Sequence, residues 1–333
     1  MKKILFLIIL GVALYFGVRY LSHKPEGNGS ASSPQEIEWG LNFSPNFSRD
    51  LGYDPQELYL RILDDLKPLY LRLPIYWQNV EKEKDKFDFS EYDFYVSEAK
   101  KRNIRLTLAV GRKLPRWPEC HEPDWVKKIS QEESNKELLD YIETSVLKYK
   151  DDLALEAWQV ENEPFLPFGT CPKADSALLE KEISLVRSLD THHPILITDS
   201  GEIGTWFQAI KNADIFGTTM YRVIWNKYLG YFKYPLPPQF FWVKTNLIKL
   251  IYKDTPIIVS ELQAEPWGPK LIFETPLEDQ MKSMSIEQLR DNISYAKKVG
   301  FSKNYLWGTE WWYYILDKYN KPEFLEEIKM TLR

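Results

Sequence analysis

The sequence predicts an α/β protein whose main domain is a (β/α)8 TIM barrel, preceded by one N-terminal membrane-anchor helix. Eight short apolar segments alternate with eight amphipathic segments between residues 36 and 333, and no change of composition divides them. Alternating strands and helices imply a parallel sheet, and eight units in about 298 residues favour a closed barrel. The anchor is predicted from an uncharged apolar run near the start of the chain.

The predicted strands are short runs rich in apolar and β-branched residues, as is typical of buried strands. They are Ile37–Phe43, Tyr70–Ile75, Ile104–Val110, Ala154–Val160, Ile195–Thr198, Ile215–Met220, Ile257–Ser260 and Asn304–Leu306.

Helical periodicity fills the intervals between these strands. The predicted helices are Pro55–Lys67, Ser90–Arg102, Glu133–Lys150, Ala174–Leu189, Ile203–Lys211, Phe240–Tyr252, Ile286–Val299 and Glu323–Leu332. Asp54 caps the first of them, and Asn103 and Gly300 are stop signals for two others.

An open doubly wound sheet is the alternative arrangement of these elements. Such sheets usually open with a Gly-rich turn, but no G-x-G-x-x-G or G-x-x-x-x-G-K-[ST] pattern occurs, so we expect no nucleotide ligand. The net charge of −5 gives no sign of a basic surface for nucleic acid. Two Cys and four His without clustering predict no metal site, and we expect no cofactor.

The N-terminal region predicts two further segments. Residues 1–22 carry two lysines before an apolar run, which indicates a signal anchor with the rest of the chain outside. A cleaved signal peptide is the first alternative, although Arg19–Lys24 do not provide the small residues that signal cleavage requires. A buried helix is the second alternative. Residues 23–35, rich in Gly, Ser and Pro, predict a flexible linker to the domain at 36–333. We therefore expect a membrane-anchored protein with an extracytoplasmic catalytic domain, or a secreted one after cleavage.

Carboxylates stand at the ends of the fourth and seventh predicted strands, as Glu161-Asn162-Glu163-Pro164 and as Glu261. In such barrels the chemistry lies at the carboxyl ends of the strands, and the fourth and seventh strands face one another. Glycoside hydrolysis needs two carboxyl groups in different environments, one protonated and one ionised.

These residues resemble glycoside hydrolase clan A, the retaining glycosidases built on a (β/α)8 barrel, with families 5, 39 and 42 as models. The resemblance spans most of residues 36–333, and Leu71–Trp77 with Phe87–Asp93 match the clan pattern after strand two. It implies that Glu163 is the acid/base and Glu261 the nucleophile.

The resemblance also implies supporting roles. Asn162 would hydrogen-bond the sugar 2-hydroxyl, and Trp307 would form the floor of the −1 subsite. Arg72 would lie beneath the nucleophile and Tyr221 would hydrogen-bond it, both favouring its ionised form. From the residues alone, Arg72 as a structural ion pair and Tyr221 as an aromatic residue closing the barrel remain alternatives.

Aromatic residues make up 15% of the chain, and eight of its 12 Trp fall at carboxyl strand ends or in the loops that follow. Trp faces stack on sugars and carboxylates accept bonds from hydroxyl groups. The candidate substrate-binding residues are Trp77, Trp117, His121, Trp267, Glu310 and Trp311. For Trp117 and His121, the alternative is a structural role in a rigidly packed loop. For Trp311, the alternatives are that it covers the barrel mouth or contacts lipid.

Two further pairs leave alternatives open. Cys120 and Cys171 lie in adjacent loops of an exported domain, which permits a disulfide, and two free thiols are the alternative. Glu161 shares a side with Glu163 by strand alternation. It either tunes the acid/base or turns to an outer contact, which we favour.

The sequence thus predicts a retaining glycosidase that cleaves O-glycosyl bonds of a β-linked oligosaccharide or polysaccharide through a covalent glycosyl-enzyme. The alternatives are a non-catalytic carbohydrate-binding barrel and a transglycosidase that remodels envelope glycans. The first would keep the Trp residues and lose a carboxylate, whereas this sequence keeps both.

Overall fold

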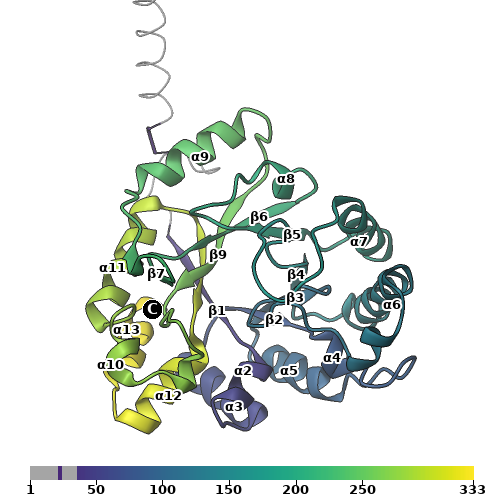
Figure 1. The fold of residues 1–333 in the computed structure, drawn as a ribbon, viewed down its shortest axis with the longest axis horizontal. Helices are drawn as coiled ribbons and strands as arrows, with labels where there is room; N and C mark the ends of the chain where they lie inside the picture. Colours follow the sequence, from purple (N-terminus) through teal and green to yellow (C-terminus); the bar gives the residue numbers. More distant parts are fainter. Residues whose placement is uncertain (1–21, 25–35) are drawn as a thin grey trace, which may run out of the picture.

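The computed structural model describes residues 22–24 and 36–333. Eight parallel strands close into a barrel in the order β1-β10-β9-β6-β5-β4-β3-β2, and helices surround it (Figure 1). The strands are β1 (Glu38–Asn42), β2 (Tyr70–Pro74), β3 (Arg105–Val110), β4 (Leu155–Val160), β5 (Ile195–Asp199), β6 (Ile215–Met220), β9 (Ile257–Gln263) and β10 (Lys303–Trp307). The predicted closed barrel is confirmed, and the open sheet is excluded.

The predicted strands agree closely with the observed ones. The largest difference is at β9, which continues to Gln263 instead of ending at Ser260. Glu261 therefore lies within the strand, where it pairs in register with Thr219 of β6 across a shift in the ladder. This pairing fixes the backbone of Glu261 more firmly than a loop position would.

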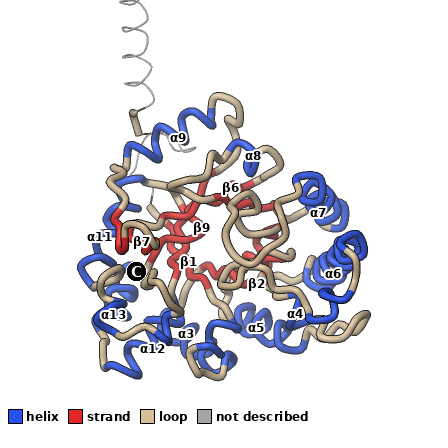
Figure 2. Tube along the Cα trace, viewed as in Figure 1, coloured by secondary structure: helices blue, strands red, loops and turns tan. Residues whose placement is uncertain are grey.

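The helices form an outer ring around the strands (Figure 2). They are α2 (Pro45–Asp50), α3 (Pro55–Leu66), α4 (Trp77–Val80), α5 (Ser90–Lys101), α6 (Gln131–Tyr149), α7 (Ser176–Leu189), α8 (Phe207–Ile210), α9 (Gln239–Lys249), α10 (Leu277–Gln280), α11 (Ile286–Val299), α12 (Thr309–Tyr319) and α13 (Glu323–Thr331), with 3-10 turns at Asp124–Lys128 and Ile272–Glu274. Asp54 caps α3 by accepting from two backbone N–H groups, and α11 ends at Gly300 with φ +82°.

The sequence prediction missed several elements inside the loops. The longest is α12, which was expected to be an irregular loop after the eighth strand. Seven of its eleven residues are buried, so it shows no alternation between an apolar and a polar face, and periodicity could not reveal it. The loop after β6 also contains an antiparallel hairpin, β7 (Val223–Asn226) and β8 (Gly230–Lys233).

The barrel interior changes from apolar to polar along the strands. Near their amino ends Leu196, Ile258 and Tyr305 form a buried cluster. A Cβ on Gly40 would lie 2.7 Å from the Tyr305 ring, so only glycine fits there. Toward the carboxyl ends the buried side chains include Arg72 and other polar groups. A polar layer inside a closed barrel needs internal hydrogen-bond partners, and these belong to the candidate site.

The predicted anchor at residues 1–22 and the linker at 23–35 lie almost wholly outside the described residues. Within the described part of the chain, every helix is too short or too polar to cross a membrane.

Candidate active site

Arg72 of β2 is the centre of the polar layer, and its side chain is fully buried. Its guanidinium donates to oxygens on three other strands and on the loop after β4. The acceptors are Glu261 Oε1 at 2.8 Å, Asn42 Oδ1 at 2.8 Å, Asn162 Oδ1 at 2.8 Å and Gln159 Oε1 at 2.5 Å. The planar fork of donors thus fixes the carboxylate and the amide at the barrel mouth relative to each other.

Glu261 is held by two donors. Besides Arg72, the Tyr221 hydroxyl donates to Glu261 Oε2 at 2.9 Å. The two donors each hold one oxygen of the Glu261 carboxyl group and so fix its orientation at the barrel mouth. Burial and the neighbouring Glu261 raise the pKa of Tyr221 well above its usual range, so the phenol stays a donor.

Glu163 lies in the turn directly after β4, with φ +42°. Its backbone N–H donates to Thr198 Oγ1 at 2.9 Å, and the Thr219 hydroxyl donates to its Oε1 at 3.2 Å. Burial raises the pKa of Glu163 well above 4.5, and the nearby charge of Glu261 raises it further. The two carboxyl groups therefore sit in opposite environments.

Glu163 and Glu261 share one cleft of about 630 Å³ at the carboxyl ends of the strands. Its lining includes the predicted residues Asn162, Trp117, Trp267, Tyr221 and Trp307, and it has the size of a site for a small oligosaccharide.

An aromatic wall runs along this cleft. Trp117 is 54% exposed at the rim, and its ring centroid lies 6.1 Å from that of Phe168. Phe168 lies 5.5 Å from Trp267, which in turn packs against Tyr221 at 5.3 Å. The sequence prediction found Trp117 and Trp267 but missed Phe168, because nothing in its loop distinguishes one aromatic residue from another.

The role in substrate binding that the sequence predicted for two tryptophan residues is wrong. Trp77 and Trp311 are fully buried, so neither can stack on a sugar. Trp77 Nε1 donates to Glu81 Oε2 at 2.6 Å, and Trp311 Nε1 donates to Gln280 Oε1 at 2.7 Å. Both lie in helices that pack against the barrel, and their position after a strand was therefore misleading.

His121 and Glu310 also lack access to the cleft. His121 is 1% exposed, and its ring lies 4.3 Å from Tyr76. Glu310, in α12, is fully buried, accepts from Ser44 N, and pairs with Arg116 Nη2 at 3.0 Å. The prediction that both residues contact the substrate directly is therefore wrong. Glu310 acts instead on Arg116.

Arg116 was missed as a site residue. Its guanidinium lies between two rings, 3.7 Å from the centroid of Phe47 and 4.1 Å from that of Trp307. It also pairs with Glu265 and Glu310. The paired cation thereby supports Trp307, which ends β10 and lines the cleft.

A disulfide joins Cys120 to Cys171, and so ties the loop after β3 to the loop after β4. The residue before Cys120, Glu119, lines the cleft, and its Oε2 accepts from Asn162 Nδ2 at 3.4 Å. It was overlooked because no strand end or clan motif marks it.

Glu161 turns away from the cleft, as we favoured from the sequence. With φ +57°, it accepts from the backbone N–H groups of Arg112 and Lys113, each at 2.7 Å. It lines a separate cavity of about 290 Å³ with Glu182 of α7, whose buried Oε2 has no hydrogen-bond partner among the residues that the structure describes. Burial raises the pKa of Glu161 to about 7 and that of Glu182 well above 4.5.

Among the described residues, one group of carboxylates is close enough to share a cation, namely Glu81, Asp85 and Glu137. It lies outside the cleft lining. Glu81 accepts from Trp77 Nε1 and Asp85 N, and Glu137 pairs with Lys84, so the group already has protein partners.

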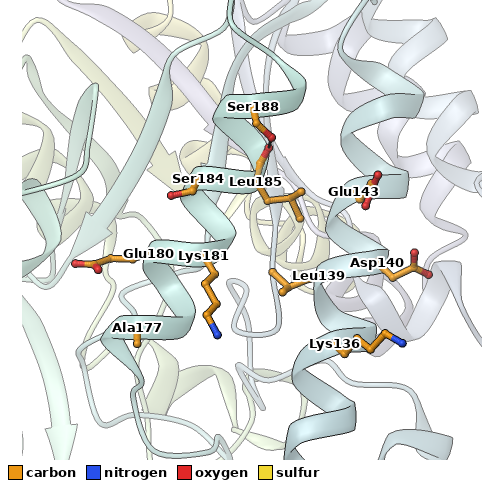
Figure 3. Close-up of a pocket in the computed structure, with 10 residues that line it drawn as sticks. All are labelled: Lys136, Leu139, Asp140, Glu143, Ala177, Glu180, Lys181, Ser184, Leu185 and Ser188. Atoms are coloured by element: carbon orange, nitrogen blue, oxygen red, sulfur yellow. Dashed lines mark hydrogen bonds between the residues drawn. The ribbon is translucent and has the colours of Figure 1, made fainter.

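The outer surface has a further hollow of about 840 Å³ between α6 and α7 (Figure 3). Leu139 and Leu185 lie on its facing walls, and Lys136, Asp140 and Lys181 belong to its charged lining. It lacks the aromatic residues and paired carboxyl groups of the cleft. We assign it no chemistry.

A closed (β/α)8 barrel with two carboxyl groups at the mouth of its fourth and seventh barrel strands is the arrangement that the resemblance to clan A glycosidases implies. The family model described as Glycosyl hydrolase family 10 matches residues 74–178, about a third of the chain, from the end of β2 into α7. This partial match and the closed barrel bear out the resemblance to clan A glycosidases. Curated protein sequences give no match.

Solved structures share the fold at low identity. Xylanase 10B from Thermotoga petrophila RKU-1 is 17% identical with a TM-score of 0.54, covering 85% of this chain and 87% of that one. The β-galactosidase from Halorubrum lacusprofundi is 15% identical with a TM-score of 0.54, covering 81% and 52%. GH5_18 from Streptomyces cattleya is 10% identical with a TM-score of 0.56, covering 83% and 71%. The chain spans about half the length of the β-galactosidases it matches first.

Replacing Glu182 tests the outer carboxyl pair. The folded protein keeps the Glu182 proton above pH 4.5, where the unfolded chain loses it, so stability falls as pH rises through this window. Glu182→Gln should reduce this fall and raise stability at pH 8 by about 1–3 kcal/mol, with little change near pH 4.5. Urea unfolding at both pH values measures it. Glu180→Gln, exposed on the same helix, is the control, and equal pH profiles for Glu182→Gln and wild type would contradict the assignment.

Proposed function

We propose that this chain is a retaining glycosidase that cleaves β-linked oligosaccharides or polysaccharides by double displacement, with Glu261 as nucleophile and Glu163 as acid/base. The observation that carries the proposal is the contrast between the two carboxyl groups. Glu261 receives the Arg72 guanidinium and the Tyr221 hydroxyl, whereas the Glu163 carboxyl group is desolvated and, among the described residues, receives only the Thr219 hydroxyl. One group is prepared to attack and the other to give a proton.

In the first step, a Glu261 oxygen attacks the anomeric carbon and the glycosidic C–O bond breaks. The protonated Glu163 gives its proton to the departing oxygen, which leaves as an alcohol. Asn162 lies beside both groups, with its Oδ1 fixed by Arg72, and we assign it to the sugar next to the cleaved bond. Trp307 is assigned to the floor of that subsite.

In the second step, water replaces the protein at the anomeric carbon. The ester that forms removes the charge of Glu261, and with it a main cause of the raised pKa of Glu163. Glu163 is then a carboxylate that takes a proton from water as the ester bond breaks, and both groups return to their starting states. One carboxyl pair thus serves both halves of the reaction.

The preference for β-linked sugar chains rests on likeness alone. The solved structures with this fold include a xylanase in complex with xylobiose and several β-galactosidases. The aromatic wall of Trp117, Phe168 and Trp267 extends the cleft beyond one sugar, which favours a chain of several units.

We also propose that residues 1–22 anchor the chain in a membrane, with the catalytic domain outside. The apolar run behind two lysines supports this. The described residue His23 lies at α9, where Asn246 Nδ2 donates to its carbonyl at 3.0 Å. Close by, Leu250 and Ile251 are 61% and 64% exposed, an apolar surface that lipid would cover.

Glu261→Ala should lower kcat by about 10³-fold or more, because the covalent step is lost. External azide should restore part of the activity and release a glycosyl azide of inverted configuration, as seen by NMR. The exposed Glu83→Ala is the matched control and should behave as wild type. Loss without azide rescue, together with an inverted sugar product from the wild-type protein, would remove Glu261 as nucleophile.

Glu163→Ala should affect substrates according to their leaving groups. Aryl glycosides with poor leaving groups should lose about 10²–10⁴-fold in the glycosylation step, because they need the proton. Those with a dinitrophenyl group should lose little in this step, as measured by single-turnover kinetics. An equal loss across the series would contradict the acid role.

Cell fractionation tests the anchor. In cells expressing the full chain, the protein should stay in the membrane pellet after an alkaline carbonate wash, and external protease should digest its domain. Recovery in the soluble fraction, with a mass that lacks the N-terminal residues, would show a cleaved signal instead.

A further inference from the structure

Carboxyl groups outnumber cations around the cleft. Its lining has six acidic side chains and two basic ones. The acids are Asp50, Glu119, Glu163, Glu202, Glu261 and Glu265, and the bases are Arg116 and Lys270. The carboxylates in this lining disfavour a glycan that carries carboxylate or sulfate groups, and a positively charged glycan would favour the ionised form of the acids whose pKa is raised.

The cations near the reacting groups are already engaged. The hydrogen bonds that the Arg72 guanidinium donates end on side-chain oxygens of Gln159, Asn42, Glu261 and Asn162. Arg116 is shared between two carboxylates beneath Trp307. Lys113 Nζ donates to the carbonyl oxygens of Glu163 and Leu166, at 2.9 and 2.7 Å. The hydrogen-bond donors of these three cations are thus used within the protein, while the charges of Lys113 and Arg72 act on Glu119 from a distance.

Glu119 is one of the acids of the cleft lining that have no ion pair among the described residues. Within the part of the chain that the structure describes, no basic nitrogen lies within 4.0 Å of its carboxyl oxygens, and the bond from Asn162 Nδ2 at 3.4 Å is its hydrogen bond. Burial and the nearby charge of Glu261 raise the pKa of Glu119 to about 8. An added cation at this point would favour the carboxylate.

The position of Glu119 is fixed from three sides. Its neighbour Cys120 is bonded to Cys171, and Thr170 N donates to Pro118 O at 2.9 Å. A Cβ on Gly169 would lie 2.4 Å from the Cβ of Glu119, so glycine lets the two loops touch. A carboxyl group held this firmly is suited to select a substrate group by charge and place.

Asn162 determines what kind of group fits beside Glu119. Its Oδ1 accepts from Arg72 Nη2 at 2.8 Å and from Thr198 Oγ1 at 3.2 Å, so its Nδ2 is directed toward Glu119. Glu119 therefore uses one of the two amide N–H groups of Asn162, and its own carboxyl oxygens are acceptors that face the cleft. A substrate group that lies against the Glu119 carboxylate donates a hydrogen bond to it.

We propose that the cleft selects a glycan with free, protonated amino groups, and that Glu119 is the carboxylate that holds the amino group of the sugar at the cleavage site. This rests on the proposed glycosidase function, whose substrate class it specifies. An ammonium group donates three hydrogen bonds and supplies the missing positive charge. A hydroxyl group donates one bond without charge, and an acetylated amine is larger and uncharged. Glu202, at the side of the cleft where Tyr221 N donates to its Oε1 at 3.1 Å, offers a second unpaired carboxyl group for another amino sugar of the chain.

The test compares aryl β-glycosides that share one leaving group and differ at carbon 2, as hydroxyl, amino or acetamido, in both the gluco and galacto series. For wild type, kcat/KM for an amino glycoside should exceed that of its hydroxyl counterpart by about tenfold or more. In Glu119→Gln this ratio should fall at least tenfold, and the fall should be smaller in Glu119→Asp, which keeps the charge. Glu83→Gln, an exposed site, should keep the wild-type ratio.

A wild-type preference for the hydroxyl or acetamido glycoside, or an unchanged ratio in Glu119→Gln, would overturn the inference while leaving the glycosidase function intact. If wild type cleaves no glycoside of either series, calorimetric binding of a glucosamine oligosaccharide decides. Binding that weakens about tenfold or more in Glu119→Gln supports the amino-group site even then. Binding that does not depend on Glu119, or no binding at all, overturns it.

Discussion

The buried guanidinium of Arg72 is the interaction on which the rest of the site depends. It lies in the polar layer of a closed barrel, where an unpaired charge would be very costly, and it therefore requires acceptors from β1, β4, β9 and the loop after β4. Those acceptors include Glu261 and Asn162. The need to satisfy one cation thus orients the groups that the proposed reaction uses.

A second buried cation organises the other side of the cleft. Arg116 lies between the rings of Phe47 and Trp307 and pairs with Glu265 and Glu310. With Arg72 committed to Glu261 and Arg116 to these two acids, Glu163, Glu119 and Glu202 are left without an ion pair among the described residues. For Glu163 this absence favours the protonated form that an acid needs. For Glu119 it leaves a carboxyl group that a positively charged substrate group would convert to the carboxylate and pair with.

Some of the aromatic residues line the cleft, and others pack in the protein interior. Trp117, Trp267 and Trp307 reach the cleft, and Trp77 and Trp311 fill the space between barrel and helices. Four of the five follow a barrel strand in the sequence, and Trp307 ends one. Position after a strand therefore predicted which end of the barrel each residue occupies, but not which way its side chain points.

The sequence by itself determined the eight βα units, and with them the level at which Glu163 and Glu261 stand, because strand and helix periodicity depend on local residue order. It also indicated Arg72, Asn162 and Tyr221 through their likeness to clan A. Only the tertiary structure decided that Glu161 turns outward, that Glu310 holds Arg116, and that Glu119 enters the cleft. Those outcomes depend on contacts between loops distant in sequence, including the Cys120–Cys171 bond, and on the sharing of buried charges, which no local pattern records.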